Sequence, residues 1–143
     1  MKKKLTIQIS EGLGNQLFMY AFAYSLSKKL NYNFYIDNKS GFYRNKNLLR
    51  NHQFYMLNYF NIIENLADTK TIYDTPLKIF QKKFKLFFDN FFKKKSFLIE
   101  KKIKLKNKKI VEEFINYDDY KFSDNLYIQG NFENYKYFLK HKN

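Results

Sequence analysis

An apolar segment that leads into a glycine loop and then into a helical pattern constrains the fold more than any other feature of this chain. Apolar and polar residues alternate over residues 5–10, which is the period of a β-strand. Gly12 and Gly14 follow, and glycine permits backbone angles and close approaches that a side chain would block. Asn15 then suits the N-cap of a helix over residues 15–30. The apolar positions at helical spacing are Leu17, Tyr20, Ala21 and Tyr24. A helix N-terminus after such a loop favours phosphate binding.

The rest of the chain continues this alternation of strands and helices. We predict strands over residues 33–37 and 126–128, and a short helix or extended segment over residues 54–63. A second long helix begins at Pro76, because proline is tolerated in a first turn. Residues 93–109 read as an unpatterned connection. The pattern predicts a layered α/β domain with a parallel, Rossmann-like sheet.

Composition excludes several kinds of site. The chain has 143 residues and no cysteine, which rules out disulfides, thiolate metal sites and cysteine nucleophiles. His52 and His141 lie far apart without metal-ligand spacing, so we expect no metal site and no cofactor. Asp118 and Asp119 read as a solvated turn pair. No apolar run is long enough to predict a transmembrane helix.

The net charge of +14 is concentrated in one segment. Lysine dominates residues 77–109, where the acidic residues are Asp89 and Glu100. The same segment carries a stripe on one helical face, formed by Phe80, Phe84, Phe87, Phe88, Phe91 and Phe92. Three interpretations remain open: packing in the core or on a solvated face, contact with an anionic membrane surface, and nucleic-acid binding. Nucleic acid is the least favoured, since Arg44 and Arg50 are the only arginines.

Two motifs give the chain a family resemblance. The first motif resembles the opening of glycosyltransferase family 11, the alpha-1,2-fucosyltransferases that use GDP-fucose. It consists of Gly12-Leu13-Gly14-Asn15-Gln16-Leu17-Phe18, followed by residues 20–23. Residues 130–138 resemble a second motif of that family, which ends in Lys-Tyr-Phe. Residues 57–62 and Asp37 also fit the family pattern.

The chain departs from that pattern at identifiable places. Glu11 stands where the family usually has glycine, and Met19 replaces a common glutamine. Asn131, Glu133 and Asn134 differ from the usual residues of the second motif. The family's donor-binding segment, His-x-Arg-x-Gly-Asp, does not occur in these residues.

The resemblance implies an N-terminal half of a two-domain, GT-B-like glycosyltransferase, whose C-terminal donor-binding domain is absent here. Residues 1–143 would form one α/β domain, with residues 77–109 as a lysine- and phenylalanine-rich amphipathic insertion. The implied reaction moves fucose from GDP-fucose to a galactoside hydroxyl, with inversion and without an essential metal, in the synthesis of a surface polysaccharide or lipopolysaccharide. Gly12, Gly14, Asn15 and Gln16 would contact the donor, and no catalytic residue is assigned. The donor-binding half would come from a missing segment or a separate chain, so the isolated chain is expected to be inactive.

An alternative of another class is a non-catalytic module that binds a membrane surface or an acidic partner through residues 77–109. Under both interpretations we expect a cytoplasmic protein, and membrane contact would place it peripherally at the inner face. The glycine loop taken alone does not decide between them, because many such loops only turn the chain.

Overall fold

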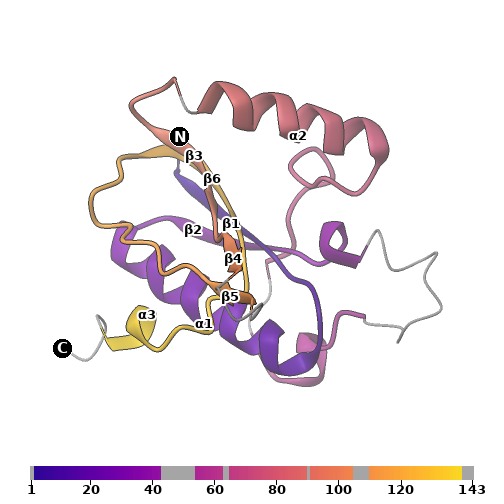
Figure 1. Ribbon diagram of the computed structural model, residues 1–143. Helices are drawn as coiled ribbons and strands as arrows, with labels where there is room; N and C mark the ends of the chain where they lie inside the picture. Colours follow the sequence, from indigo (N-terminus) through magenta and orange to yellow (C-terminus); the bar gives the residue numbers. More distant parts are fainter. Residues whose placement is uncertain (1, 43–53, 63–64, 90, 105–109, 140–143) are drawn as a thin grey trace.

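Four parallel strands form the main sheet. The computed structural model describes residues 2–42, 54–62, 65–89, 91–104 and 110–139. The strands are β1 (Lys4–Gln8), β2 (Asn33–Asp37), β3 (Lys95–Ile99) and β6 (Phe122–Gln129). Their order across the sheet is β2-β1-β6-β3 (Figure 1). Strands β1 and β6 are therefore central, and the loops that follow them meet in the middle of the carboxyl edge. The predicted α/β domain with a parallel sheet is confirmed.

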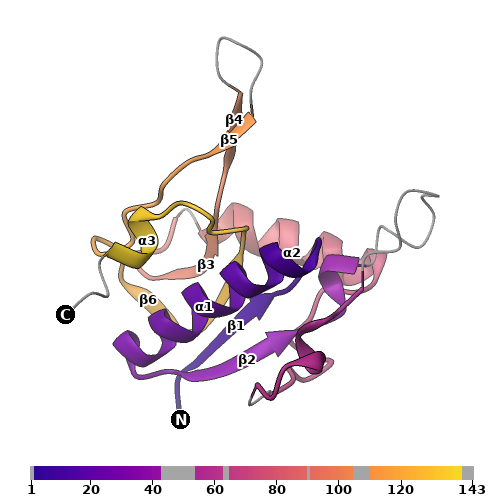
Figure 2. The same ribbon diagram turned by 90° about the horizontal axis from the view of Figure 1, so that it is seen from below.

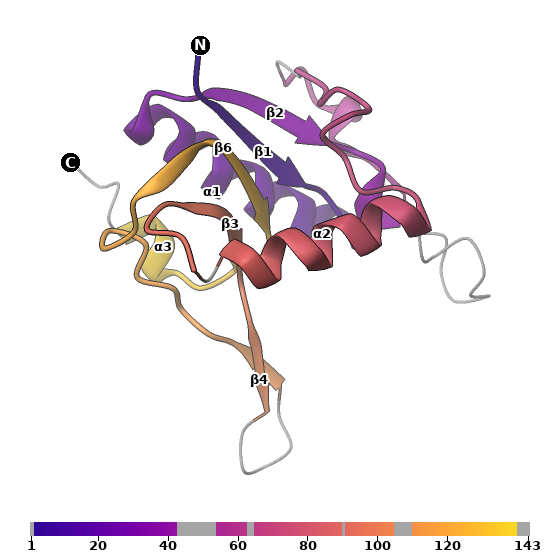
Figure 3. The same cartoon turned by 90° about the horizontal axis from the view of Figure 1, so that it is seen from above.

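The two long helices lie on opposite faces of the sheet (Figures 2 and 3). Helix α1 (Leu13–Leu30) follows β1 and packs on β1 and β2. Helix α2 (Pro76–Asp89) lies on the other face and contacts β3. The buried cluster on the α1 side contains Leu5, Ile7, Ile9, Phe34, Ile36, Leu126 and Ile128 from the strands, with Met19, Phe22, Ala23 and Leu26 from α1. Because side chains alternate along a strand, the other residues of β1, β2 and β6 face α2.

An aromatic cluster packs the C-terminal residues 130–138 against α1. The Phe22 ring stacks on Phe132 with a centroid distance of 4.1 Å, and Tyr137 lies 4.9 Å from Phe22. Tyr137 belongs to the short helix α3 (Lys136–Leu139), and its ring is fully buried. Much of the second motif, residues 130–138, therefore serves the core.

The buried face of α1 differs from the predicted stripe. Leu17, Ala21 and Tyr24 are exposed, and the buried apolar residues are Met19, Phe22, Ala23 and Leu26. The reason is that α1 carries apolar residues on most of its sides, so spacing alone could not select the side that meets the strands.

The helix start was also predicted wrongly. The chain turns at Glu11, whose φ is 62°, and Gly12 is the N-cap of a helix that begins at Leu13. Asn15 therefore lies inside the first helical turn and is not the N-cap. The predictions of a strand over residues 33–37 and of a helix from Pro76 are confirmed.

The lysine-rich segment 77–109 contains regular elements of the domain. They include most of α2 and the edge strand β3, which pairs in parallel with β6. Strand β4 (Lys102–Lys104) then pairs with β5 (Ile110–Glu112) in an antiparallel hairpin that projects from the sheet (Figure 2). The described part of the expected unpatterned connection over 93–109 thus contains strands β3 and β4. Each strand is stabilised by a partner outside that segment, because pairing can stabilise segments with weak local patterns. A single 3₁₀ turn, η2 (Leu57–Tyr59), lies within the ambiguous segment 54–63.

Candidate functional site

Polar side chains gather at the carboxyl ends of the parallel strands. Gln8, Asp37 and Gln129 are the last residues of β1, β2 and β6, and Glu100 directly follows β3. In open parallel sheets, ligands bind outside these ends, at the point where the chain leaves the central strands in opposite directions. Here β1 connects to β2 on one side, while β3 and β6 lie on the other. The candidate site therefore lies between the loop after β1 and the turn after β6.

The glycine loop leaves open space at the start of α1. A Cβ built on Gly12 or Gly14 would meet no described atom within 4 Å beyond the adjacent residues and the backbone of α1. The φ of Gly12 is −78°, and Gly14 lies in the first turn of α1, so neither needs the left-handed backbone that glycine favours. The expected role of these glycines in unusual backbone angles is therefore wrong. Their remaining effect is to keep the backbone amides of the first turn accessible to a group from outside the described chain.

The carboxylate of Glu11 joins the two motifs. Its Oε2 accepts hydrogen bonds from the side-chain amides of Asn15 and of Asn131, the latter at 3.1 Å. Its Oε1 lies 3.5 Å from Nζ of Lys102 on β4. A negative charge at a helix N-terminus is electrostatically favourable. The site is thus centred on a half-buried carboxylate that contacts α1, the turn after β6 and β4.

The side chain of Gln16 lies in the interior of the domain. It is fully buried, and its Nε2 donates to the backbone oxygens of Glu11 at 2.8 Å and Phe54 at 2.9 Å. Its Oε1 accepts from the backbone N–H of Met56 at 2.9 Å. These bonds tie the glycine loop to residues 54–56. Gln16 therefore positions the loop, and its side-chain amide faces away from the open edge.

A second buried carboxylate shapes the turn after β6. Oε2 of Glu100 accepts from the backbone N–H groups of Asn131 and Phe132, both at 2.8 Å. Gly130 has a φ of 154°, and a Cβ there would lie 2.4 Å from Cβ of Glu100. Burial raises the pKa of Glu100, against the opposing effect of these hydrogen bonds. Glycine at 130 therefore lets the turn close over Glu100 and aims Asn131 at Glu11.

A polar layer lies beneath α2. Nζ of Lys82 donates to Oε1 of Gln129 at 2.5 Å and to Oε1 of Gln8 at 3.2 Å. The same ammonium lies 4.6 Å from the ring centroid of Tyr127. Burial lowers the pKa of Lys82 to about 8, although the nearby Asp37 carboxylate acts in the opposite direction. This lysine was missed in the sequence, where nothing distinguishes it from its neighbours.

Asp37 has an internal role in this layer. The hydroxyl of Tyr127 donates to its Oδ2 at 2.6 Å, and the backbone N–H groups of Lys39 and Ser40 donate to its Oδ1. Burial, and then the charge of Asp37, raise the pKa of Tyr127. The second-strand aspartate that fitted the family pattern thus anchors the turn after β2.

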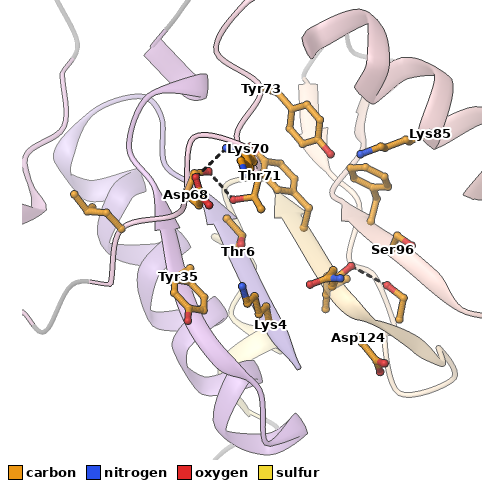
Figure 4. A pocket seen from close by; sticks show the side chains of 16 residues that line it. Lys4, Thr6, Tyr35, Asp68, Lys70, Thr71, Tyr73, Lys85, Ser96 and Asp124 are labelled. Carbon is orange, nitrogen blue, oxygen red and sulfur yellow. Dashed lines mark hydrogen bonds between the residues drawn. The ribbon is translucent and has the colours of Figure 1, made fainter. Parts of the chain in front are cut away.

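An open pocket of about 600 Å³ lies away from the carboxyl edge, on the sheet face beside α2. Figure 4 shows Thr6 and Tyr35 on its β1–β2 side, with Tyr73 and Lys85 toward α2. Its lining comes from the amino-terminal and central parts of the strands, including Lys4, and from residues 66–73. The pocket and the glycine loop are therefore two separate features.

The remaining predicted residues contribute little to the site. Arg44, Arg50, His52 and His141 lie outside the described residues. Asp118 and Asp119 form the predicted turn. Across the described ranges, no three His, Cys, Asp or Glu side chains are grouped so that they could hold a metal ion.

Comparisons of the chain with protein-family models, with curated proteins and with solved structures found no match. None of the helices in the described residues combines the length and apolar content needed to cross a membrane.

Proposed function

We propose that this chain is the N-terminal domain of a GT-B-like glycosyltransferase that moves fucose from GDP-fucose to a galactoside hydroxyl. The observation that supports this function is the contact between the two motifs that resemble family 11. Glu11 borders the first motif and Asn131 belongs to the second, and their side chains are hydrogen-bonded at the carboxyl edge. Segments more than a hundred residues apart thus share one site.

The charges suggest how donor and acceptor would divide this site. A phosphate charge about 5 Å from the Glu11 carboxylate would be repelled by about 3 kcal/mol at an effective dielectric constant of about 20. The diphosphate would therefore lie over the open backbone at Gly12 and Gly14, on the side away from Glu11, where the first-turn N–H groups favour anions. The Asn15 side-chain amide donates to the Glu11 carboxylate, so Asn15 would hold that charge away from the diphosphate. The place beside Glu11 suits a neutral sugar hydroxyl.

This arrangement gives Glu11 a chemical role. Its carboxylate would accept the proton of the acceptor hydroxyl as the hydroxyl oxygen bonds to C1 of fucose. The bond from C1 to the diphosphate oxygen breaks at the same time, and GDP leaves with the electron pair. Attack from the face opposite the leaving group inverts C1. The helix N-terminus would stabilise the departing charge.

Backbone NMR tests the proposal directly. We expect GDP-fucose to shift the amide resonances of Gly12, Gly14 and Asn15 in ¹⁵N–¹H spectra, with smaller shifts from UDP-galactose. Lactose should shift resonances near Glu11 and Asn131, and the Glu11→Gln variant should lose that response. Glu133→Gln is the matched control, because Glu133 is exposed in the same turn region.

Two results would contradict the proposal. The first is the absence of any response to sugar nucleotides or galactosides at the carboxyl edge. The second is a response confined to the pocket near Thr6 and Tyr35, which would move the ligand site to the other end of the strands.

A further inference from the structure

Helix α2 is oriented with its charged side inward and its aromatic side outward. Its buried residues are Lys82 and Asp89. The phenylalanines of the stripe are 41–74% exposed, and Leu77 is 67% exposed. At 100° per residue, Phe80, Phe84 and Phe87 lie almost opposite Lys82 on the helix, whereas Phe91 and Phe92 follow the end of α2 at Asp89. A helix on a globular domain normally buries its apolar side, so this orientation is reversed.

Specific polar contacts hold the helix in this orientation. Lys82 donates to Gln8 and Gln129 at the ends of the central strands. The carboxylate of Asp89 accepts from the backbone N–H groups of Ser96 and Phe97 on β3, at 2.7 and 3.4 Å. Turning the stripe toward the sheet would break all of these bonds. Of the interpretation that placed the stripe in the core or on a solvated face, the core half is therefore contradicted, whereas an exposed face agrees with the structure.

Four of the exposed rings, those of Phe84, Phe87, Phe88 and Phe91, contact one another in one continuous cluster. Centroid distances are 4.8 Å for Phe84–Phe88, 5.4 Å for Phe87–Phe88 and 5.6 Å for Phe87–Phe91. Contiguous apolar surface of this kind marks a site of interaction with a partner or a membrane. We refer to Phe80, Phe84, Phe87, Phe88, Phe91 and Phe92 together as the phenylalanine surface.

Exposed lysines surround the phenylalanine surface. Lys83 and Lys85 border it on either side of the helix, and Lys93 and Lys94 follow Phe92. Asp89 is the one acidic residue between Leu77 and Ile99, and it faces inward. An apolar stripe between lysines matches the acyl boundary and the charged headgroups of an anionic lipid surface.

We infer that α2 lies in the interface of an anionic membrane, with the phenylalanine surface in the acyl boundary and the flanking lysines among the headgroups. A second copy of the chain fits less well, because a two-fold interface would bring the same lysines together in a protein of net charge +14. Nucleic acid would use the lysines and leave the rings uncovered. The inference is independent of the proposed reaction, since it rests on α2 and not on the glycine loop.

Vesicle co-sedimentation tests the inference. We expect binding to POPC–POPG vesicles, weak binding to POPC alone, and release as salt rises, because lysine–headgroup attraction is screened. The triple variant Phe84→Ser, Phe88→Ser, Phe91→Ser should bind about tenfold or more weakly while circular dichroism shows a folded protein. The matched control is the triple variant Phe54→Ser, Tyr59→Ser, Tyr135→Ser, which removes exposed rings elsewhere on the domain. This control should bind the vesicles as the wild type does. Wild-type binding by the folded phenylalanine variant, or failure of the wild type to bind, overturns the inference.

A tryptophan probe keeps the test valid if the serine variant unfolds. The chain contains no tryptophan, so Phe88→Trp introduces a single reporter. Its emission should shift to the blue with POPC–POPG vesicles and be quenched by brominated lipid, whereas Tyr59→Trp should do neither. An unchanged Phe88→Trp spectrum overturns the inference. Light scattering that shows a dimer of the wild type, which Phe88→Ser converts to a monomer, would assign the surface to a second copy.

Discussion

Glu11 shows how one side chain can join distant parts of a chain. Its backbone takes the positive φ that turns β1 into α1, and its carboxylate accepts from Asn15 and Asn131. The sequence marked Glu11 only as a departure from a glycine pattern. Its surroundings, which make it a candidate proton acceptor, come from three other segments.

Asn15→Ala should separate binding from stability. Asn15 is not the N-cap and is half-buried, so losing its hydrogen bond to Glu11 should lower the free energy of unfolding by no more than about 1 kcal/mol. GDP-fucose affinity, measured by NMR titration, should fall severalfold. Asn58→Ala, on the exposed turn η2, is the control. Wild-type donor affinity in folded Asn15→Ala would remove this residue from the site.

Alanine at Gly14 and at Gly130 should have opposite effects on stability. Gly14 lies in a helix with open space around it, so Gly14→Ala should raise the free energy of unfolding by about 0.5–1 kcal/mol. Gly130→Ala should lower it by about 1–3 kcal/mol, because φ is 154° and the new Cβ would overlap Glu100. Urea denaturation measures both. Equal effects at the two positions would contradict this assignment.

Helix α2 illustrates how a tertiary contact can reverse an element's expected orientation. Its pattern alone favours burying the phenylalanine stripe, because that is where its apolar area lies. The ends of β1 and β6, however, present glutamine side chains toward α2, and these accept from Lys82. Polar partners on the sheet thus select the lysine side of the helix.

Lys82 should give stability an unusual pH dependence. Its pKa is about 8 in the folded chain and about 10.5 in the unfolded one, so between these values the unfolded state binds more protons. The free energy of unfolding should therefore rise by about 1.5 kcal/mol from pH 8 to about pH 9.5. At higher pH the tyrosines oppose this rise, because Tyr73 and Tyr127 have raised pKa values and keep protons that unfolded tyrosine loses. Lys82→Met should abolish the rise in urea denaturation, and Lys83→Met, on the exposed side, should retain it. A rise that persists in Lys82→Met would show that another group causes it.

At the scale of the whole molecule, the domain has two surfaces with different chemistry. The carboxyl edge of the sheet carries Glu11, Asn15 and Asn131, while the outer side of α2 carries the phenylalanine surface. If α2 lies on a membrane, the carboxyl edge beside it would face substrates near that surface. Both proposals would then describe one enzyme working on a membrane-bound acceptor.

Purified residues 1–143 should transfer no fucose from GDP-fucose to lactose, although they should respond to both ligands. The family resemblance assigns the diphosphate-binding arginine to a His-x-Arg-x-Gly-Asp segment that these residues do not contain. Without that charge the leaving group is poorly stabilised. Chromatographic detection of time-dependent fucosyl-lactose formation would contradict the idea that this chain is half of a site.

Local sequence patterns are enough to predict the class of fold and the order of the early elements. The signals for these elements are local, because they depend on backbone period and on single-residue geometry. They are the alternation of apolar and polar residues over β1, the pattern over residues 33–37 of β2, and the proline at the start of α2. The sequence motif also identified Gly12, Gly14 and Asn15, which lie at the carboxyl edge of the sheet in the structure.

Contacts between distant segments select which sides of the helices are buried and which polar groups form hydrogen bonds. Three features depend on partners far along the chain. They are the burial of Met19 in place of Leu17, the inward orientation of Lys82, and the formation of strand β3 inside a lysine-rich segment. The Glu11–Asn131 contact likewise requires β1 and β6 to be neighbours. Periodicity describes one segment at a time, whereas burial and hydrogen bonding depend on what a second segment presents to the first.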